Sequence, residues 1–130
     1  MHDTSPLDLH GRPADFEEHF DGGVLDETVW WPHYNPHWST RELTAARYTV
    51  GPSGLELTID ADTPPWSPEF DGEVRCSHLQ TGQLSGPLGS GVGQHRFREG
   101  LVVREEQPER RGLLVEHGVI EVRMAAVGQP

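Results

Sequence analysis

The sequence has a single cysteine, no lysine and a shortage of positive charge. With only Cys76 present, an internal disulfide framework and a zinc site built on several cysteines are both excluded. The 21 acidic residues outnumber the 10 basic residues, all of them arginine, and give a formal net charge of -11. Proteins that bind nucleic acid need a basic stripe that displaces counterions from the phosphates. We therefore expect no nucleic-acid partner.

Long apolar runs are also missing. No stretch approaches the roughly 20 apolar residues of a membrane-spanning helix, so no membrane partner is expected. The segment from Met1 to Pro13 is polar and lacks the charged and then apolar layout of a signal peptide. The chain as written would stay in the cytoplasm, but an exported parent whose signal lies outside this sequence stays open, so the compartment is not predicted. Residues 1–13 are predicted to form a flexible leader, and residues 14–130 to belong to one domain.

Helical periodicity is absent as well. Apolar residues do not recur at helical spacing over a dozen residues, whereas 15 glycines and 11 prolines separate short apolar runs. This pattern favours an all-β fold in which short strands form two packed antiparallel sheets. We expect strands over residues 16–20, 45–50, 55–61, 73–80, 96–104 and 113–126.

The clearest local prediction is a hairpin. Gly51-Pro52-Ser53-Gly54 separates two of the expected strands and is typical of a tight turn. In the second strand, Leu55, Leu57 and Ile59 fall on one face while polar residues fall on the other, which indicates a half-buried antiparallel strand.

The last expected strand has the most regular pattern. Ile120, Val122 and Met124 share one face of it, and Glu121 and Arg123 share the other. The two charged side chains can therefore pair or bind a ligand jointly. The same pattern is also typical of a strand surface that simply faces water.

The segment from Trp30 to Trp38 is rich in aromatic and polar side chains, the combination that sugar binding requires. Trp30 is predicted to pack in the core, with Trp31 beside it. Asn35 and Trp38 are either contacts in a groove or part of the core. Trp66, in a loop stiffened by prolines, either lines the rim of a groove or caps the edge of the sheets.

Four segments form a pattern when taken in order. The first runs from Phe16 to Trp30 and includes the pairs Phe20-Asp21 and Leu25-Asp26. The others are Trp38-Ser39-Thr40-Arg41-Glu42, the strand around Gly54-Leu55-Glu56-Leu57, and His117-Gly118-Val119-Ile120-Glu121-Val122-Arg123. Together, over about residues 14–127, they resemble the N-terminal part of glycoside hydrolase family 16. The chain departs from the family in Glu18 and His19, and in having His117 and Ile120 where the family has Tyr and Phe.

This resemblance implies a concanavalin-A-like jelly-roll β-sandwich, incomplete in this chain, with a sugar-binding groove on its concave sheet. It implies a polysaccharide or oligosaccharide substrate, a β-1,3 or mixed β-1,3/1,4 glucan, hydrolysed with retention in the full-length parent. The substrate contacts that it implies are Asn35, Trp38, Arg41, Glu121 and Arg123.

The family's catalytic motif, Glu-x-Asp-x-x-Glu or Glu-x-Asp-x-Glu, follows the Glu-x-Arg strand, and the chain ends before that point. We therefore expect a fragment that lacks about 100 residues of the domain and has no activity of its own.

One stretch imitates the missing motif. Glu69, Asp71 and Glu73 would share one face if they lay on a strand, as a retaining glycosidase requires of its carboxylates. They precede the Glu-x-Arg strand, follow three prolines and include a glycine, so a solvated acidic loop is the favoured interpretation. They are kept as weak catalytic candidates only.

No metal site is expected from His33 and His37, because nearby prolines prevent the helix that would bring them together. No cofactor is predicted, apart from a structural calcium ion that the resemblance leaves open. Two other interpretations also stand. The chain can be a non-catalytic, lectin-like carbohydrate-binding module, or a truncated product with unpaired strand edges and no stable fold.

Overall fold

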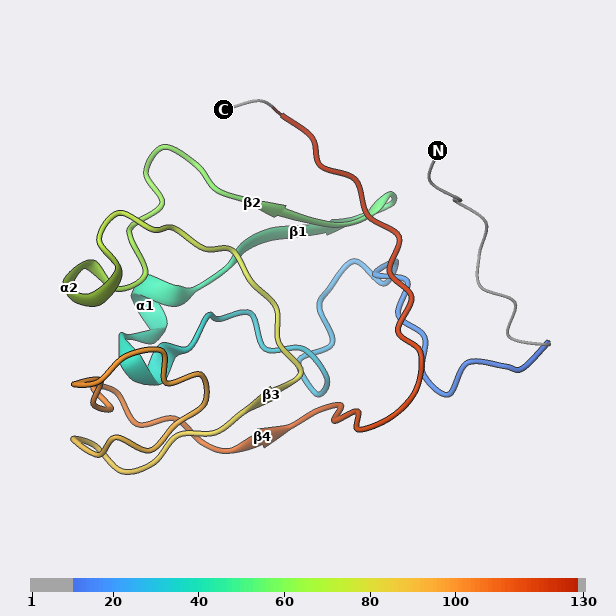
Figure 1. The fold of residues 1–130 in the computed structure, drawn as a ribbon. Coiled ribbons are helices and arrows are strands. Elements are labelled where there is room, and N and C mark those ends of the chain that lie inside the picture. Colours follow the sequence, from blue (N-terminus) through green and yellow to red (C-terminus); the bar gives the residue numbers. More distant parts are fainter. Residues whose placement is uncertain (1–10, 129–130) are drawn as a thin grey trace, which may run out of the picture.

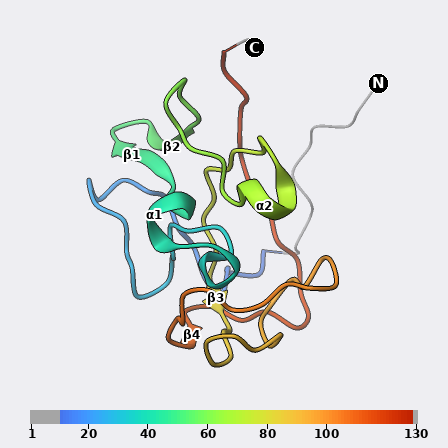
Figure 2. The same cartoon turned by 90° about the vertical axis from the view of Figure 1, so that its left-hand side faces the viewer.

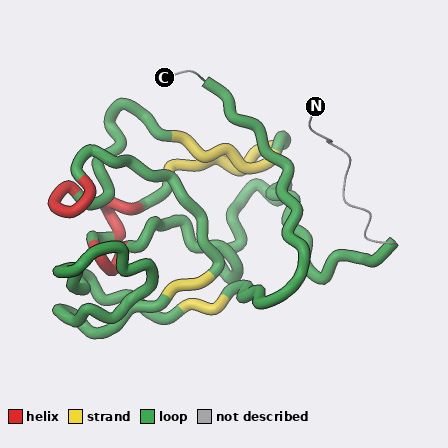
Figure 3. The backbone as a smooth tube through the Cα atoms, viewed as in Figure 1, coloured by secondary structure: helices red, strands yellow, loops and turns green. Residues whose placement is uncertain are grey.

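The computed structural model describes residues 11–128, so residues 1–10 of the expected leader lie outside the described part. The chain is mostly strand and loop with little helix, as expected for an all-β fold (Figures 1 and 3). Its elements are η1 (Pro36–Trp38), α1 (Arg41–Thr44), β1 (Arg47–Gly51), β2 (Gly54–Thr58), α2 (Pro68–Asp71), β3 (Gly82–Gln83) and β4 (Arg110–Arg111). Within residues 11–128, no helix is both long and apolar enough to span a membrane.

The predicted hairpin is confirmed. β1 and β2 pair in an antiparallel arrangement that sets Gly51 opposite Gly54, so Pro52 and Ser53 alone form the connection. Gly54 has a φ of 109°, a value that side chains with a Cβ rarely adopt. The apolar face of β2 is less covered than the sequence predicts, because Leu57 remains 41% exposed.

A second, smaller ribbon joins distant parts of the sequence. β3 and β4 pair antiparallel with Gln83 opposite Arg110. The two views of the ribbon diagram place this pair on the opposite side of the molecule from the β1–β2 hairpin, with α1 between them (Figures 1 and 2). The chain next to β4 approaches a neighbouring turn very closely, since a Cβ atom on Gly112 would overlap the backbone of Val29.

The core is small and built around two indoles. Trp38, Trp66, Leu101 and Val103 are buried together, and the partly buried Cys76 packs against them. Each buried indole N–H has an acceptor, as burial of a polar group requires. Trp38 Nε1 donates to the carbonyl of Gln94 at 2.9 Å, and Trp66 Nε1 donates to Asp71 Oδ2 at 2.8 Å. Trp66 is therefore a core residue, not the rim of a groove.

Four of the predicted strands do not form, and three of them are interrupted locally. Residues 96–104 are interrupted by a turn at Gly100, whose φ is 88°. Residues 73–80 have only an isolated bridge at Gln80, and the backbone N–H of Arg47 is bound by the Ser77 hydroxyl instead of a strand. In residues 16–20 the backbone leaves the extended conformation at Phe20, whose φ is 50°.

The largest difference concerns the predicted strand over residues 113–126. This segment is loop throughout, because no second strand lies beside it among residues 11–128. An alternating pattern predicts which side chains would share a face, but a strand also needs a ladder of backbone partners.

Candidate functional site

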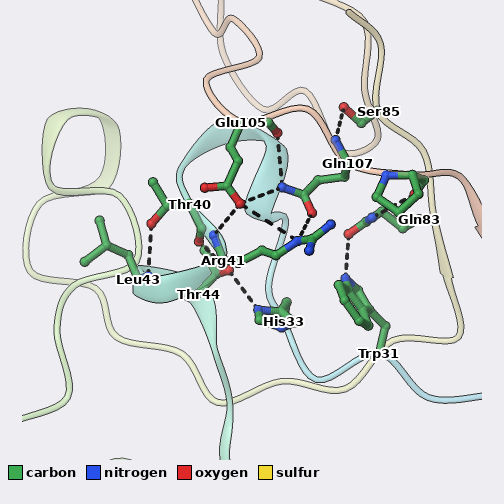
Figure 4. Close-up of polar contacts among 11 residues, drawn as sticks. Trp31, His33, Thr40, Arg41, Leu43, Thr44, Gln83, Ser85, Glu105 and Gln107 are labelled. Carbon is green, nitrogen blue, oxygen red and sulfur yellow. Dashed lines mark hydrogen bonds and ion pairs between the residues drawn. The ribbon is translucent and has the colours of Figure 1, made fainter. Parts of the chain in front are cut away.

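Trp31 lies where a tight turn meets the β3–β4 ribbon. The turn closes with a hydrogen bond from Trp30 N–H to the Asp26 carbonyl at 2.9 Å. Trp31 then exchanges two backbone hydrogen bonds with Gln80, at 2.6 and 3.0 Å, just before β3 begins. This bridge fixes the indole beside the ribbon, where its Nε1 donates to Gln83 Oε1 at 2.7 Å (Figure 4).

Two guanidinium groups lie over the Trp31 ring. The Cζ atom of Arg110 is 3.9 Å from the ring centroid, and that of Arg41 is 5.5 Å away. Cations are attracted to the electron-rich face of an indole. Arg110 is held further by its hydrogen bond to the Glu27 carbonyl. The indole therefore orients an arginine whose remaining N–H groups can meet a ligand.

A cavity of about 280 Å³ opens beside this pair. It is bounded by the turn before Trp31 on one side and by β4 on the other. Two carboxylates, two guanidinium groups and two hydroxyls therefore border one small space. Its lining comprises Glu27, Thr28, Val29, Trp31, Thr81, Pro108, Glu109, Arg110, Arg111 and Gly112.

A second cavity, of about 460 Å³, adjoins the first. The two share Thr81, Glu109, Arg110 and Arg111, so they lie along the same ribbon. The second has a different character, because three glutamine side chains border it. Its lining comprises Gln80, Thr81, Gly82, Gln83, Leu84, Gln94, Glu109, Arg110, Arg111 and Leu114.

Arg41 is the first residue of α1, and it is held by two neighbouring side chains, one carboxylate and one amide (Figure 4). Thr40 caps α1 by accepting a hydrogen bond from Leu43 N–H at 3.1 Å, a common use of threonine at this position. The Nε atom of Arg41 donates to Gln107 Oε1 at 2.7 Å, and its backbone N–H donates to Glu105 Oε1 at 3.1 Å.

Gln94 links several buried polar groups. Its amide Nε2 donates to Gln80 Oε1 at 2.8 Å and to Asn35 Oδ1 at 3.3 Å. Its carbonyl accepts from Trp38 Nε1 and lies 3.1 Å from Nε2 of His37. Because a carbonyl can only accept, His37 Nε2 carries the hydrogen in that bond, and burial lowers the pKa of the His37 imidazole.

The predicted contacts Asn35 and Trp38 are brought together, but inside the protein. Trp38 is fully buried and Asn35 is 4% exposed, and both contact Gln94. Trp38 belongs to the core cluster, which is one of the two positions that the sequence left open, and the predicted role of both residues as substrate contacts stays a prediction. Arg41 is exposed and lies near Trp31, close to the candidate site.

Glu121 and Arg123 lie elsewhere. Both are exposed in the loop that follows β4, and no ion pair joins them in the described part of the chain. The expected strand face that would set them side by side is absent. Their predicted role as substrate contacts stays a prediction.

The weak catalytic candidates do not share a strand face. Glu69 and Asp71 belong to the four-residue helix α2, and Glu73 follows in a turn. Each carboxylate has a separate partner: Glu69 pairs with Arg104, Asp71 accepts from Trp66, and Glu73 pairs with Arg75 at 3.2 Å. This arrangement agrees better with a solvated acidic segment than with three carboxylates aligned for catalysis.

Sequence reasoning missed most of this site. The sequence predicts Trp31 in the core beside Trp30, and it predicts no site over residues 107–112. The usable signal was Glu109-Arg110-Arg111, a dense charged run of the kind that also lines binding sites, but nothing in the sequence pairs it with Trp31. Within residues 11–128, no three His, Cys, Asp or Glu side chains gather to hold a metal ion.

Comparison with known proteins gives one informative likeness. No protein-family model matches the sequence, and no curated protein matches it. Among solved structures, the chain is similar to the GlcNAcα1-4Gal-releasing endo-β-galactosidase from Clostridium perfringens. The TM-score is 0.66 at 30% sequence identity, over 85% of this chain and 26% of that one. The chain thus spans about a quarter of that glycoside hydrolase, and the likeness supports a glycosidase-like fold.

Proposed function

We propose that this chain is the carbohydrate-contacting part of a glycoside-hydrolase-like protein, and that it binds sugar in the cavity between Trp31 and β4. One observation carries the proposal. Trp31, Arg110 and the carboxylates of Glu27 and Glu109 border one cavity of about 280 Å³. Ligand clefts are usually about 300–1,000 Å³, so this volume is at the small end and fits a single sugar ring better than a long chain.

The chemistry of the lining fits sugar hydroxyls. Carboxylates accept hydrogen bonds from hydroxyl groups, and a guanidinium donates several from one plane. Arg110 lies on the Trp31 face with Cζ 3.9 Å from the ring centroid. Sugar binding here therefore depends on hydrogen bonds from an oriented arginine, with the indole edge supplying apolar contact. The adjoining glutamine-lined cavity extends the site for a second sugar unit.

For the whole parent protein we propose a jelly-roll domain of the family 16 type that hydrolyses β-1,3 or mixed β-1,3/1,4 glucan with retention. The support is the ordered set of family-like motifs and the likeness to an endo-acting glycosidase. Retaining hydrolysis needs two carboxylates about 5–5.5 Å apart across the scissile bond. In this chain Glu69, Asp71 and Glu73 are each bound to other groups, so we propose that these 130 residues bind without cleaving.

A second substrate follows from the structural neighbour. That enzyme releases GlcNAcα1-4Gal, a galactose-containing unit, so a galactoside competes with β-glucan as the ligand proposed here. A lectin-like module without any catalytic parent would bind at the same cavity. A preference for β-glucan or for a galactoside separates the first two proposals. Sugar binding by this chain does not separate either of them from a lectin-like module.

The test is an NMR titration of the 15N-labelled chain with β-1,3-glucan oligosaccharides, mixed-linkage oligosaccharides and GlcNAcα1-4Gal. We expect the Trp31 indole N–H signal, assigned by loss in Trp31→Phe, to shift with one of these series. Arg110→Ala should abolish the shift. The matched control is Arg98→Ala, which removes another arginine that lies over an aromatic ring, here Phe70 at 5.7 Å.

Each result decides a different part of the proposal. No shift with any sugar would overturn sugar binding at this cavity. A shift that survives Arg110→Ala would place the site elsewhere. Release of reducing ends from β-glucan by the chain, lost in a Glu69→Gln and Glu73→Gln variant, would overturn binding without cleavage and restore the weak candidates.

We also propose that binding needs no cofactor. The lining offers carboxylates, guanidinium groups and hydroxyls, which can bond sugar hydroxyls directly. Titration after dialysis against a chelator should therefore give the same shifts. Loss of binding that calcium restores would instead support the structural calcium ion that the family resemblance leaves open.

A further inference from the structure

Gln83 is a buried amide whose two ends bind two different segments of the chain. It belongs to β3 and is 3% exposed. Its Oε1 atom accepts a hydrogen bond from the Trp31 indole N–H at 2.7 Å (Figure 4). Its Nε2 atom donates to the carbonyl of Pro108 at 3.0 Å. One side chain therefore joins the segment that carries Trp31 to the segment that leads into β4.

Only one orientation of the Gln83 amide satisfies both partners. An indole N–H can only donate and a carbonyl oxygen can only accept, so Oε1 must face Trp31 and Nε2 must face Pro108. An ionised glutamate at this position would offer an acceptor but no donor. A methionine of similar length would offer a weak acceptor and no donor. The two contacts together therefore require an amide.

The two partners of Gln83 belong to opposite walls of the first cavity. Trp31 borders that cavity from the side of the turn, and Pro108 borders it from the side of β4. Gln83 itself borders the second cavity. Its side chain thus reaches from the second cavity to both walls of the first, and its two hydrogen bonds set the separation of those walls.

The same contacts govern where Arg110 lies. In the antiparallel β3–β4 pair, Gln83 and Arg110 are directly opposite each other, so their side chains project to the same face of the ribbon. Arg110 covers the face of the Trp31 ring, with Cζ 3.9 Å from its centroid, while Gln83 binds the N–H edge of the same ring. Because Pro108 is two residues before Arg110, a shift of Pro108 would move the guanidinium relative to the ring.

We propose that Gln83 is a positioning residue of the sugar site. Its amide holds the Trp31 indole to the segment before β4, and so fixes the width of the first cavity and the place of Arg110 on the ring. Groups that bind a ligand productively must be held to within about 0.5 Å by such supporting contacts. The inference rests on the sugar site proposed above, but the two hydrogen bonds of Gln83 exist without a ligand and can be tested without one.

NMR of the ligand-free chain tests the positioning of Arg110. Protons that lie over the face of an indole are shifted upfield, so the side-chain signals of Arg110 should have an upfield shift that Trp31→Phe reduces. Gln83→Met should remove most of this shift. The indole N–H signals of the buried Trp38 and Trp66 should stay in place and show that the core is intact. A full Arg110 shift in Gln83→Met would overturn the proposal.

A control variant and a wild-type measurement separate positioning from a general loss of stability. Thr63→Val also replaces a buried hydrogen-bonding side chain by an apolar one of similar shape, since the Thr63 hydroxyl accepts from Asp60 N–H at 2.8 Å. Thr63 borders neither cavity, so this variant should keep the full Arg110 shift. If Gln83→Met does not fold, the wild-type chain decides. Its Gln83 side-chain amide protons should give a nuclear Overhauser effect to the Trp31 indole N–H proton, and the absence of that effect would overturn the proposal.

Sugar titration tests the consequence for binding. With the oligosaccharide that shifts the wild-type signals, Gln83→Met should bind at least about tenfold more weakly than wild type, and Thr63→Val should bind equally well. Equal affinity of Gln83→Met and wild type would overturn the positioning role and leave the proposed sugar site intact. If no sugar binds to the wild-type chain, the proposed function fails by itself, and the ligand-free shift of Arg110 still decides whether Gln83 holds the two walls together.

Discussion

Asp71 and Glu73 are two residues apart in the sequence, but their carboxylates contribute differently to the stability of the fold. Asp71 accepts the hydrogen bond of the buried Trp66 indole at 2.8 Å, whereas Glu73 pairs with Arg75 at the surface. An unsatisfied buried donor costs about 1–3 kcal/mol, and an exposed ion pair contributes about 0–1 kcal/mol. Asp71→Ala should therefore lower the free energy of unfolding by about 1–3 kcal/mol. Glu73→Ala should change it by less than about 1 kcal/mol. Urea denaturation measures both, and equal losses would contradict the role of Asp71.

Three histidines give the chain a pH dependence with a defined sign. Burial lowers the pKa of His33, His37 and His78 below the ordinary value of 6.5. The unfolded chain then binds more protons than the folded chain once the pH falls below about 6.5. Stability is complete above that pH and decreases as the pH falls toward the folded pKa values. Denaturation midpoints between pH 8 and 5 should show this fall, and NMR should show the three imidazoles titrating below 6.5. Titration above 6.5 would contradict the burial argument.

At the scale of elements, the β3–β4 ribbon depends on one close approach. A Cβ atom on Gly112 would overlap the backbone of Val29, so Gly112→Ala must push β4 away from the turn before Trp31. Overpacking of this kind costs about 1–3 kcal/mol. The change should also remove sugar-induced shifts of the Trp31 indole, because the cavity lies between these two segments. Gly22→Ala is the control, since its Cβ meets nothing within 4 Å. Normal binding by Gly112→Ala would show that the cavity does not need the ribbon in place.

The elements also show what the sequence can and cannot predict. The hairpin was predictable because all its information is local: a two-residue turn at Pro52 and Ser53, and alternation on either side. The β3–β4 pair was not, because Gln83 and Arg110 meet across a long separation and each strand has only two residues. The candidate site was not predictable for the same reason, because Trp31 and Arg110 are far apart in the sequence. Trp38 was predicted as a possible groove contact because the sequence alone does not distinguish an aromatic side chain in a core from one in a sugar site.

At the scale of the whole molecule, apolar side chains are unevenly covered along the described part of the chain. The buried apolar residues are Trp38, Trp66, Leu101 and Val103. The apolar side chains from Leu114 onward, as far as Val127, are exposed. The core of the described residues is therefore made by the part of the chain that precedes residue 114.

This distribution has a measurable consequence. Local opening needs the least free energy where few apolar contacts and no backbone hydrogen bonds hold the chain. Among the described residues, no backbone hydrogen bond reaches residues 114–128, whereas Val103 N–H donates to the Ser90 carbonyl at 2.8 Å. Hydrogen exchange should therefore protect the amides of Trp38 and Val103 and leave residues 114–128 exchanging at nearly the rate of an unfolded chain. Protection of residues 114–128 equal to that of Val103 would contradict this distribution.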